Sequence, residues 1–416
     1  MRTLLILPLW ALLVAQTGTA PQSKSVDQFR CAHDLLDRGE YLKAADLFEA
    51  AEAGEESPYG PLHQTAGTVL PFVSGQLKET GTPRKADPAD LRQLSNAQLR
   101  DAIPEIVKRA RRTNIVILNE EHLAPRDRAF GLEVARALRP LGYSFLAAED
   151  FASSSDPAVR QKEAKALADD GYARLKSGFY IRDPVFGDFV RQSLALGYRP
   201  LVYEYIAPRG TPAGTPSVAV RDQGEAENLV HAIFSKNPKA KVLIYVGYAH
   251  AAEAPAANSE WMAERLKKLT GVDPLTVDQT TLSPTGDSGL YAAISKRMHG
   301  RSVVPVLDGK PLKFGYLGQT VDLEVAHPPV RLIRGRPDWL FRMGRTAVEV
   351  PAKLRPRIGR VLVQAFLTSE SSDAVPVDQV IVTAGRDPPP LLVPRGPLRF
   401  AVRTGYRPGD CSAAPK

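Results

Sequence analysis

Carboxylates, imidazoles and one tyrosine lie within or directly after four apolar, strand-like segments of this sequence. They are Glu120, Glu121, His122, Glu149, Tyr203, Glu204 and His250. Arg221 and Asn228 lie nearby on an expected helix. Histidine and carboxylate side chains can bind a metal ion, or they can act as general acid and base on a bound water. The sequence therefore predicts a polar pocket built from strand ends.

Each of these residues also has a purely structural interpretation. Residues 120–122 can form a solvated turn, and Glu149 can cap the segment that follows it. His250 can be a core histidine whose ring nitrogens are hydrogen-bonded within the protein. Arg221 can form a surface ion pair that adds little to stability. The recurrence of polar residues at several strand ends favours the functional interpretation.

The elements that must position these groups alternate along the middle of the chain. Buried strands are expected at 114–119, 144–148, 201–205, 242–246 and about 275–278. Helices are expected at 126–138, 158–176, 186–196, 221–235 and 258–269. This alternation predicts an α/β fold, with a mainly parallel sheet and helices on both faces. Right-handed crossovers then bring the carboxyl ends of the strands to one edge, where ligands usually bind.

The flanking segments predict smaller units around an α/β core at 105–330. Within 21–77, apolar residues at helical spacing on both sides of Gly39 indicate a helical hairpin that resembles a single tetratricopeptide unit. We interpret it as a cap, with a protein partner as the alternative. Residues 78–104 are expected to form a linker and the start of a helix over 90–111, interrupted near Pro104. Short strands separated by Pro and Gly turns predict a C-terminal β module at 331–416.

Composition excludes some function classes. The chain has 416 residues, 44% of them hydrophobic, which is typical of folded chains with two or three domains. Its net charge of +8 comes from scattered arginines rather than from a basic run. No nucleic-acid partner is therefore expected.

The N-terminus predicts export. Arg2 precedes an apolar run at 4–15, followed by small and polar residues, so residues 1–20 are expected to be a signal peptide of a periplasmic or secreted protein. No run of about 18 apolar residues follows, so the sequence predicts no membrane span once the signal peptide is removed. Cys31 and Cys411 lie near opposite ends of the mature chain. They can form a disulfide or remain free thiols.

Four motifs carry a resemblance to a known superfamily. They are Leu118-Asn-Glu-Glu-His122 with Arg128, Ala147-Ala-Glu149, Arg221-Asp222-x-x-x-Ala-x-Asn228 and Val246-Gly-Tyr-Ala-His250. Together they resemble the superfamily that joins erythromycin-esterase-like proteins, haem-binding lipoproteins of iron uptake and Tiki-type proteases. The resemblance covers about residues 105–280, and Asn119 stands where the family usually has glycine.

The resemblance implies one pocket lined by Glu120, His122, Glu149, Arg221 and His250. We expect a hydrolase that cleaves an ester or amide, in which His122 takes the proton of a water positioned by Glu149 and Glu120. Arg221 would stabilise negative charge, and His250 would serve as a second acid/base or as a ligand. The small-molecule or peptide substrate would contact Glu121, Arg128, Tyr203, Glu204 and Asn228.

The branches of the superfamily imply different cofactors. The Tiki-like branch implies a divalent metal, Zn or Mn, on Glu120, His122 and His250, whereas the esterase-like branch implies none. The haem-binding branch implies an iron porphyrin, and a haem- or iron-binding uptake protein is the alternative function. A third alternative is an interaction scaffold with a vestigial pocket.

Overall fold

The computed structural model gives the course of most of the chain. The ranges it describes are 31–52, 85–149, 151, 156–206, 217–256, 259–407 and 409–411. The expected signal peptide, residues 1–20, lies outside the described residues. Within the described ranges, no helix combines the length and apolar character needed to cross a membrane.

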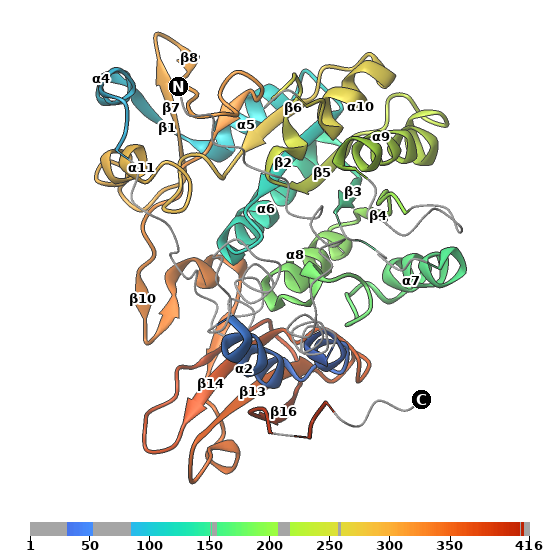
Figure 1. The fold of residues 1–416 in the computed structure, drawn as a ribbon, viewed down its shortest axis with the longest axis vertical. Helices are drawn as coiled ribbons and strands as arrows, with labels where there is room; N and C mark the ends of the chain where they lie inside the picture. Colours follow the sequence, from blue (N-terminus) through green and yellow to red (C-terminus); the bar gives the residue numbers. More distant parts are fainter. Residues whose placement is uncertain are drawn as a thin grey trace, which may run out of the picture.

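A six-stranded parallel sheet forms the core of the larger part of the molecule (Figure 1). In spatial order its strands are β4 (Arg199–Leu201), β3 (Phe145–Ala148), β5 (Val242–Gly247), β2 (Ile115–Glu120), β6 (Leu275–Asp278) and β9 (Leu323–Glu324). Every residue of β2 and β5 is buried, because both faces of the sheet are covered. The predicted α/β fold with a parallel sheet is confirmed.

Alternate residues of the central strands face opposite sides of the sheet, and helices cover each side. In β2, Val116 and Leu118 pack into one hydrophobic core, whereas Ile115 and Ile117 pack into another. The covering helices are α5 (Ala102–Ala110), α6 (Pro125–Leu138) and α8 (Pro184–Ala195) on the first side, and α9 (Val218–Leu229) and α10 (Met262–Thr270) on the second. Two packed layers of helices therefore fix the strands.

Several core elements differ from their predicted bounds, among them β4 and α7. Strand β4 ends at Leu201 rather than at 205, so Tyr203 and Glu204 follow the strand instead of lying in it. Helix α7 (Pro157–Asp170) ends before Gly171, whose φ of +74° suits a glycine at a helix end. The polar loop after β4 is therefore longer than the sequence pattern predicts.

The prediction of a helix over 90–111 is wrong. The chain instead forms α4 (Pro88–Asn96), β1 (Gln98–Asp101) and then α5. Strand β1 pairs with β7 (Val303–Leu307), whose backbone supplies the hydrogen-bond partners that this segment needs. Pro104 lies in the first turn of α5, where a proline is tolerated because its missing N–H would have no partner there.

The N-terminal hairpin packs on the C-terminal sheet. Residues 31–37 are helical and turn at Gly39, whose φ is +71°, into α2 (Tyr41–Glu52). Their apolar side chains pack on Leu175 and Leu362. The sheet consists of β14 (Asp378–Thr383), β13 (Arg360–Leu367) and β16 (Leu398–Thr404), which lie next to α2 in Figure 1.

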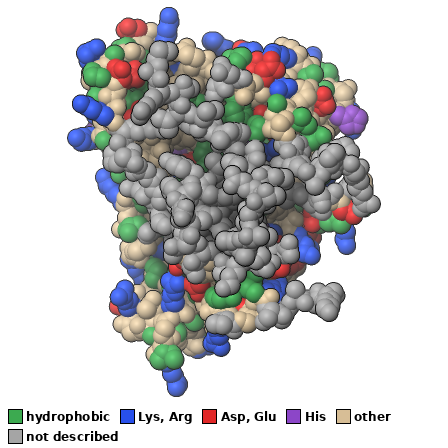
Figure 2. Space-filling view, viewed as in Figure 1, with side chains coloured by type: hydrophobic (Ala, Val, Ile, Leu, Met, Phe, Trp, Pro, Cys, Tyr) green, Lys and Arg blue, Asp and Glu red, His purple; other side chains and the backbone are tan. Residues whose placement is uncertain are grey.

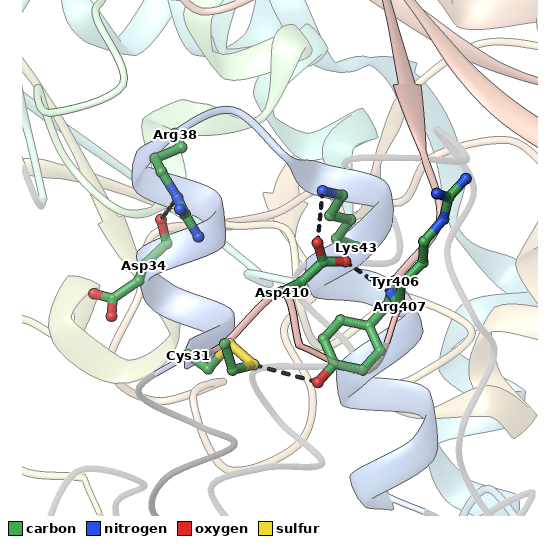
Figure 3. Close-up of a disulfide and its surroundings, with 8 residues drawn as sticks. Cys31, Asp34, Arg38, Lys43, Tyr406, Arg407 and Asp410 are labelled. Atoms are coloured by element: carbon green, nitrogen blue, oxygen red, sulfur yellow. Dashed lines mark hydrogen bonds and ion pairs between the residues drawn. A yellow bond between two sulfur atoms is a disulfide. The ribbon is translucent and has the colours of Figure 1, made fainter. Parts of the chain in front are cut away.

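A disulfide joins the hairpin to the end of the chain. Cys31 and Cys411 are bonded, with 5.5 Å between their Cα atoms (Figure 3). Lys43 of α2 pairs with Asp410 beside this bond, at 3.1 Å. Of the two alternatives that the sequence leaves open, the structure has the disulfide.

Shorter elements complete the described fold. They are η1 (Arg139–Leu141), η2 (Tyr180–Arg182), η3 (Val230–Phe234), η4 (Tyr248–Ala251), α11 (Ser288–Ser295), β8 (Lys310–Pro311), β10 (Leu332–Ile333), β11 (Arg336–Pro337), η5 (Asp338–Met343), β12 (Thr346–Val348), η6 (Ala352–Leu354) and β15 (Leu391–Val393). On the face drawn in Figure 2, lysine and arginine side chains are spread among acidic ones.

Candidate functional site

The parallel register brings three strand ends together. Glu120, the last residue of β2, lies opposite Gly247, the last residue of β5. Ala148 ends β3 opposite Tyr245, and the N–H of the next residue, Glu149, donates to the Tyr245 carbonyl at 2.9 Å. Because these strands run parallel, the polar residues that follow them gather at one edge, as predicted.

The first half of the site is the Glu120 group, which comprises Glu120, His122, Arg128 and Asp183. Arg128 is fully buried on α6 and holds Glu120 in a fork, with Nε donating to Oε2 at 2.7 Å and Nη2 to Oε1 at 2.9 Å. Its Nη1 donates to Asp183 at 2.8 Å. A buried guanidinium needs such partners, since an unpaired buried charge is costly.

This fork determines the state of Glu120 and the orientation of His122. Burial acts to raise the pKa of Glu120, but the charge and hydrogen bonds of Arg128 outweigh it and hold the pKa below its usual value. The ionised carboxylate only accepts hydrogen bonds, so the His122 Nδ1, 2.9 Å from it, is the donor. In the neutral imidazole, the Nε2 of His122 is then the proton acceptor.

Aromatic rings hold the imidazole of His122 in place. It stacks on Tyr180 of η2 with 3.9 Å between ring centroids and 14° between ring planes. Tyr248 approaches it edge-on, at 5.1 Å between centroids. Tyr248 also has a positive φ of 43°, uncommon for a residue with a side chain. The ring is therefore oriented by packing as well as by its hydrogen bond.

The second half is the Arg221 group, which comprises Glu149, Glu204, Arg221, Asp222, Glu225 and His250. Arg221 of α9 donates from Nη2 to Glu149 at 2.7 Å and from Nε to Glu204 at 2.8 Å. Its Nε also lies 2.9 Å from a carboxylate oxygen of Glu225. The guanidinium thus draws three carboxyl groups from different elements to one point.

Charges within the Arg221 group shift its pKa values in different directions. Burial acts to raise the pKa of Glu149, but Arg221 and the two histidines outweigh it and hold the pKa below its usual value. Burial raises the pKa of Glu225 well above its usual value. For His250, burial acts to lower the pKa, but Asp222 outweighs it and raises the pKa. His250 contacts Asp222 through Nδ1 at 2.6 Å, and its Nε2 lies 3.4 Å from Arg221.

The two groups meet above Gly247. A Cβ built on this glycine would lie 2.6 Å from the His122 Nε2 and 3.0 Å from the Glu149 Oε2. The Gly247 N–H donates to the same Glu149 oxygen at 2.6 Å. Only glycine leaves room here for an imidazole nitrogen and a carboxylate oxygen to converge on one point.

In the structure, several residues that were expected to bind the substrate contact other protein groups instead. Arg128 is fully buried and holds Glu120, so it positions the site rather than contacting a ligand. Tyr203 is buried, and its hydroxyl donates to the Tyr245 carbonyl at 3.5 Å, not toward a ligand. Asn228 donates to the Tyr203 carbonyl at 2.9 Å and thereby fixes the loop after β4.

The remaining expected residues have specific local roles. Glu204 binds Arg221, whereas Glu121 accepts a hydrogen bond from Thr285 and lines a separate cavity. Asn119 lies within β2, where its side chain donates to Asp278 at 2.6 Å. Asparagine therefore fits here as part of the strand.

Four contributors were given no role in the site from the sequence. Asp222 and Glu225 are three residues apart on α9, a spacing that places them on one helix face and could have been noticed. Asp183 caps α8 far along the chain from Arg128, and no local pattern links the two. Gly247 is needed for space, which only the folded packing reveals.

The donor set at this site can be compared with what a divalent metal needs. The expected set fits poorly, because Arg128 occupies both oxygens of Glu120, and Arg221 faces the Nε2 of His250. Among the described residues, the ligand atoms that do lie within 4.8 Å of one another belong to Asp222, Glu225 and His250. There too Arg221 contacts Glu225, so a guanidinium already supplies the positive charge that a metal would bring.

Chelation is therefore expected to leave the protein unchanged. We expect EDTA treatment followed by gel filtration to shift neither the thermal unfolding midpoint nor the metal content. A metal at a hundred times its Kd would add about 2.7 kcal/mol to the free energy of unfolding. A lower midpoint after EDTA, restored by Zn²⁺ or Mn²⁺, would contradict this expectation.

Comparison with known proteins adds little to this geometry. No protein-family model and no curated protein matches the sequence. The solved structure of the type III effector HopBA1 is similar over 56% of this chain and 97% of that chain, with 15% sequence identity and a TM-score of 0.32. So distant a likeness carries no functional argument, and the chemistry has to be inferred from the site itself.

Proposed function

We propose that this protein is a hydrolase that uses His122 to activate a water for attack on an ester or amide. The observation that carries the proposal is the convergence of the His122 Nε2 and the Glu149 Oε2 above Gly247. A water held between these two side-chain atoms would have a proton acceptor on one side and an ionised carboxylate on the other. That is the arrangement that general-base catalysis needs.

His122 would be the general base. Its Nδ1 donates to the ionised Glu120, which fixes the tautomer and would stabilise the imidazolium that forms when Nε2 takes a proton from water. Arg128 keeps Glu120 ionised and is therefore a positioning residue. The water's oxygen would then attack the carbonyl carbon of the substrate.

Arg221 and His250 would serve the later part of the reaction. Attack gives the carbonyl oxygen a negative charge, and the Arg221 guanidinium is the fixed cation beside Glu149 that can stabilise it. The imidazolium of His122 would then give its proton to the leaving group, whereas His250, held by Asp222 and with its Nε2 3.4 Å from Arg221, would help to position the guanidinium. The disulfide between Cys31 and Cys411 supports a periplasmic or secreted location, where such bonds persist.

Replacing Glu149 by glutamine tests the proposal. Wild-type protein is expected to hydrolyse at least one member of a panel of 4-nitrophenyl esters and peptide 4-nitroanilides. Glu149→Gln keeps the side-chain size but removes the charge that faces the water and Arg221, so kcat/KM should fall about 10²-fold or more. The control is Glu260→Gln, which changes the same charge at an exposed residue paired with Lys268.

Two outcomes would contradict the proposal. If the wild-type protein turned over no ester or anilide of the panel, the hydrolase assignment would be wrong. If Glu149→Gln and Glu260→Gln retained the same activity, the water would not lie between His122 and Glu149.

A further inference from the structure

A cavity of about 360 Å³ lies beside the site and is lined in part by Glu121. Its walls are largely apolar, with Leu282, Val330, Leu332 and Trp339 among them. Pockets for small molecules usually have volumes of about 300–1,000 Å³ and consist of apolar walls with a few polar groups. This cavity therefore has the size and the lining of a small-ligand site.

The polar group that sets this cavity apart is Arg126. It lies in the first turn of α6, is partly buried and donates from Nη1 to the carbonyl of Pro328. None of the ion pairs found between described residues involves Arg126. Arg128, two residues later, pairs with both Glu120 and Asp183. Toward the residues that the structure describes, the guanidinium of Arg126 thus keeps N–H donors free for a ligand.

The other titratable groups around the cavity do little to neutralise Arg126. Burial raises the pKa of Asp127 well above its usual value and also raises the pKa of Glu121, which favours the neutral form of both side chains. Burial lowers the pKa of Arg126 to about 10, so it remains charged at neutral pH. The positive charge of the nearby Arg342 also acts to lower the pKa of Arg126.

His327, which also lines the cavity, is a satisfied neutral side chain. Its Nε2 lies 2.8 Å from the Gln279 Oε1 and its Nδ1 lies 2.9 Å from the Ser302 hydroxyl. Burial lowers its pKa well below the usual value. The imidazole is therefore a wall of the cavity, and Arg126 is the group left to select a ligand.

We propose that this cavity binds a small organic anion, a carboxylate with an apolar or aromatic body. The carboxylate would pair with the free N–H groups of Arg126, whose planar fork matches two carboxylate oxygens. The body would lie against Trp339 and Leu332. This proposal does not rest on the hydrolase assignment, because the cavity and Arg126 lie outside the group of residues that meet above Gly247.

Calorimetric titration of the full-length protein with 2-naphthoate tests the proposal. The acid should bind at least tenfold more tightly than its neutral analogue, 2-naphthalenemethanol. Arg126→Gln should weaken naphthoate binding at least tenfold and leave the alcohol unaffected. Arg357→Gln, which removes the same charge from an exposed position, should bind naphthoate as the wild type does.

A second variant guards against misfolding of Arg126→Gln. Leu332 is 56% exposed, so Leu332→Asp should leave the fold intact while placing a negative charge at the cavity that repels naphthoate. The proposal is overturned if the wild-type protein does not bind naphthoate at millimolar concentration, if acid and alcohol bind equally, or if Leu332→Asp binds naphthoate as the wild type does. None of these readouts depends on hydrolysis.

Discussion

Replacing His122 by asparagine is expected to reduce kcat/KM for hydrolysis by about 10²–10⁴-fold, the usual contribution of a general base. Asparagine can keep a hydrogen bond to Glu120, but it has no basic nitrogen to aim at the point above Gly247. The loss should fall mainly on kcat, because an interaction made only in the transition state is removed. Initial rates on the substrate found with the ester and anilide panel provide the measurement.

A matched histidine provides the control for this substitution. His231 is exposed on η3, and His231→Asn should leave the rate unchanged. Thermal unfolding of both variants separates lost chemistry from lost folding, since His122 also stacks on Tyr180. If His122→Asn folded normally and hydrolysed the substrate within twofold of the wild-type rate, His122 would not be the base.

The periodicity of the core segments predicts the central strands of the sheet, but not its edge strand β9. Runs such as 115–118 are apolar on both faces, and the structure divides their residues between two cores on opposite sides. Strand β1 is not predicted from the sequence, because it is only partly buried and its partner, β7, follows some two hundred residues later in the chain. Local pattern therefore predicts elements that are buried on both faces better than edge elements defined by distant pairing.

The sequence predicts which residues form the candidate site, but not what each of them does there. Strand ends in a parallel sheet converge, so Glu120, His122 and Glu149 can be grouped from the strand pattern alone. Their roles depend on partners such as Asp183 and on the space left by Gly247, which come from packing across the chain. The burial of Arg128 against Glu120 and Asp183 could not be predicted for the same reason, since burial is a property of the fold.

Removing the buried cation at the back of the site should cost the protein much of its stability. Arg128→Met is expected to lower the free energy of unfolding by about 3–5 kcal/mol, because it leaves Glu120 and Asp183 buried without their counter-charge. It also removes a hydrogen bond to the His122 carbonyl, at 3.0 Å, and the contact of the guanidinium with the Phe186 ring. Urea unfolding at pH 7 provides the measurement, with the exposed Arg357→Gln as the control, expected to lie within about 0.5 kcal/mol of wild type.

The pH dependence of this loss identifies its electrostatic origin. In the wild type the pKa of Glu120 lies below its ordinary 4.5, so the pair with Arg128 stabilises the fold above that pH and loses its effect as the pH falls through the folded value. In Arg128→Met the unpaired carboxyl groups should have raised pKa values, which destabilise the fold above their ordinary pKa. The deficit should therefore be larger at pH 7 than at pH 4. Adding Glu120→Gln should recover part of it at pH 7, whereas an equal deficit at both values would show that lost packing, not buried charge, is the cause.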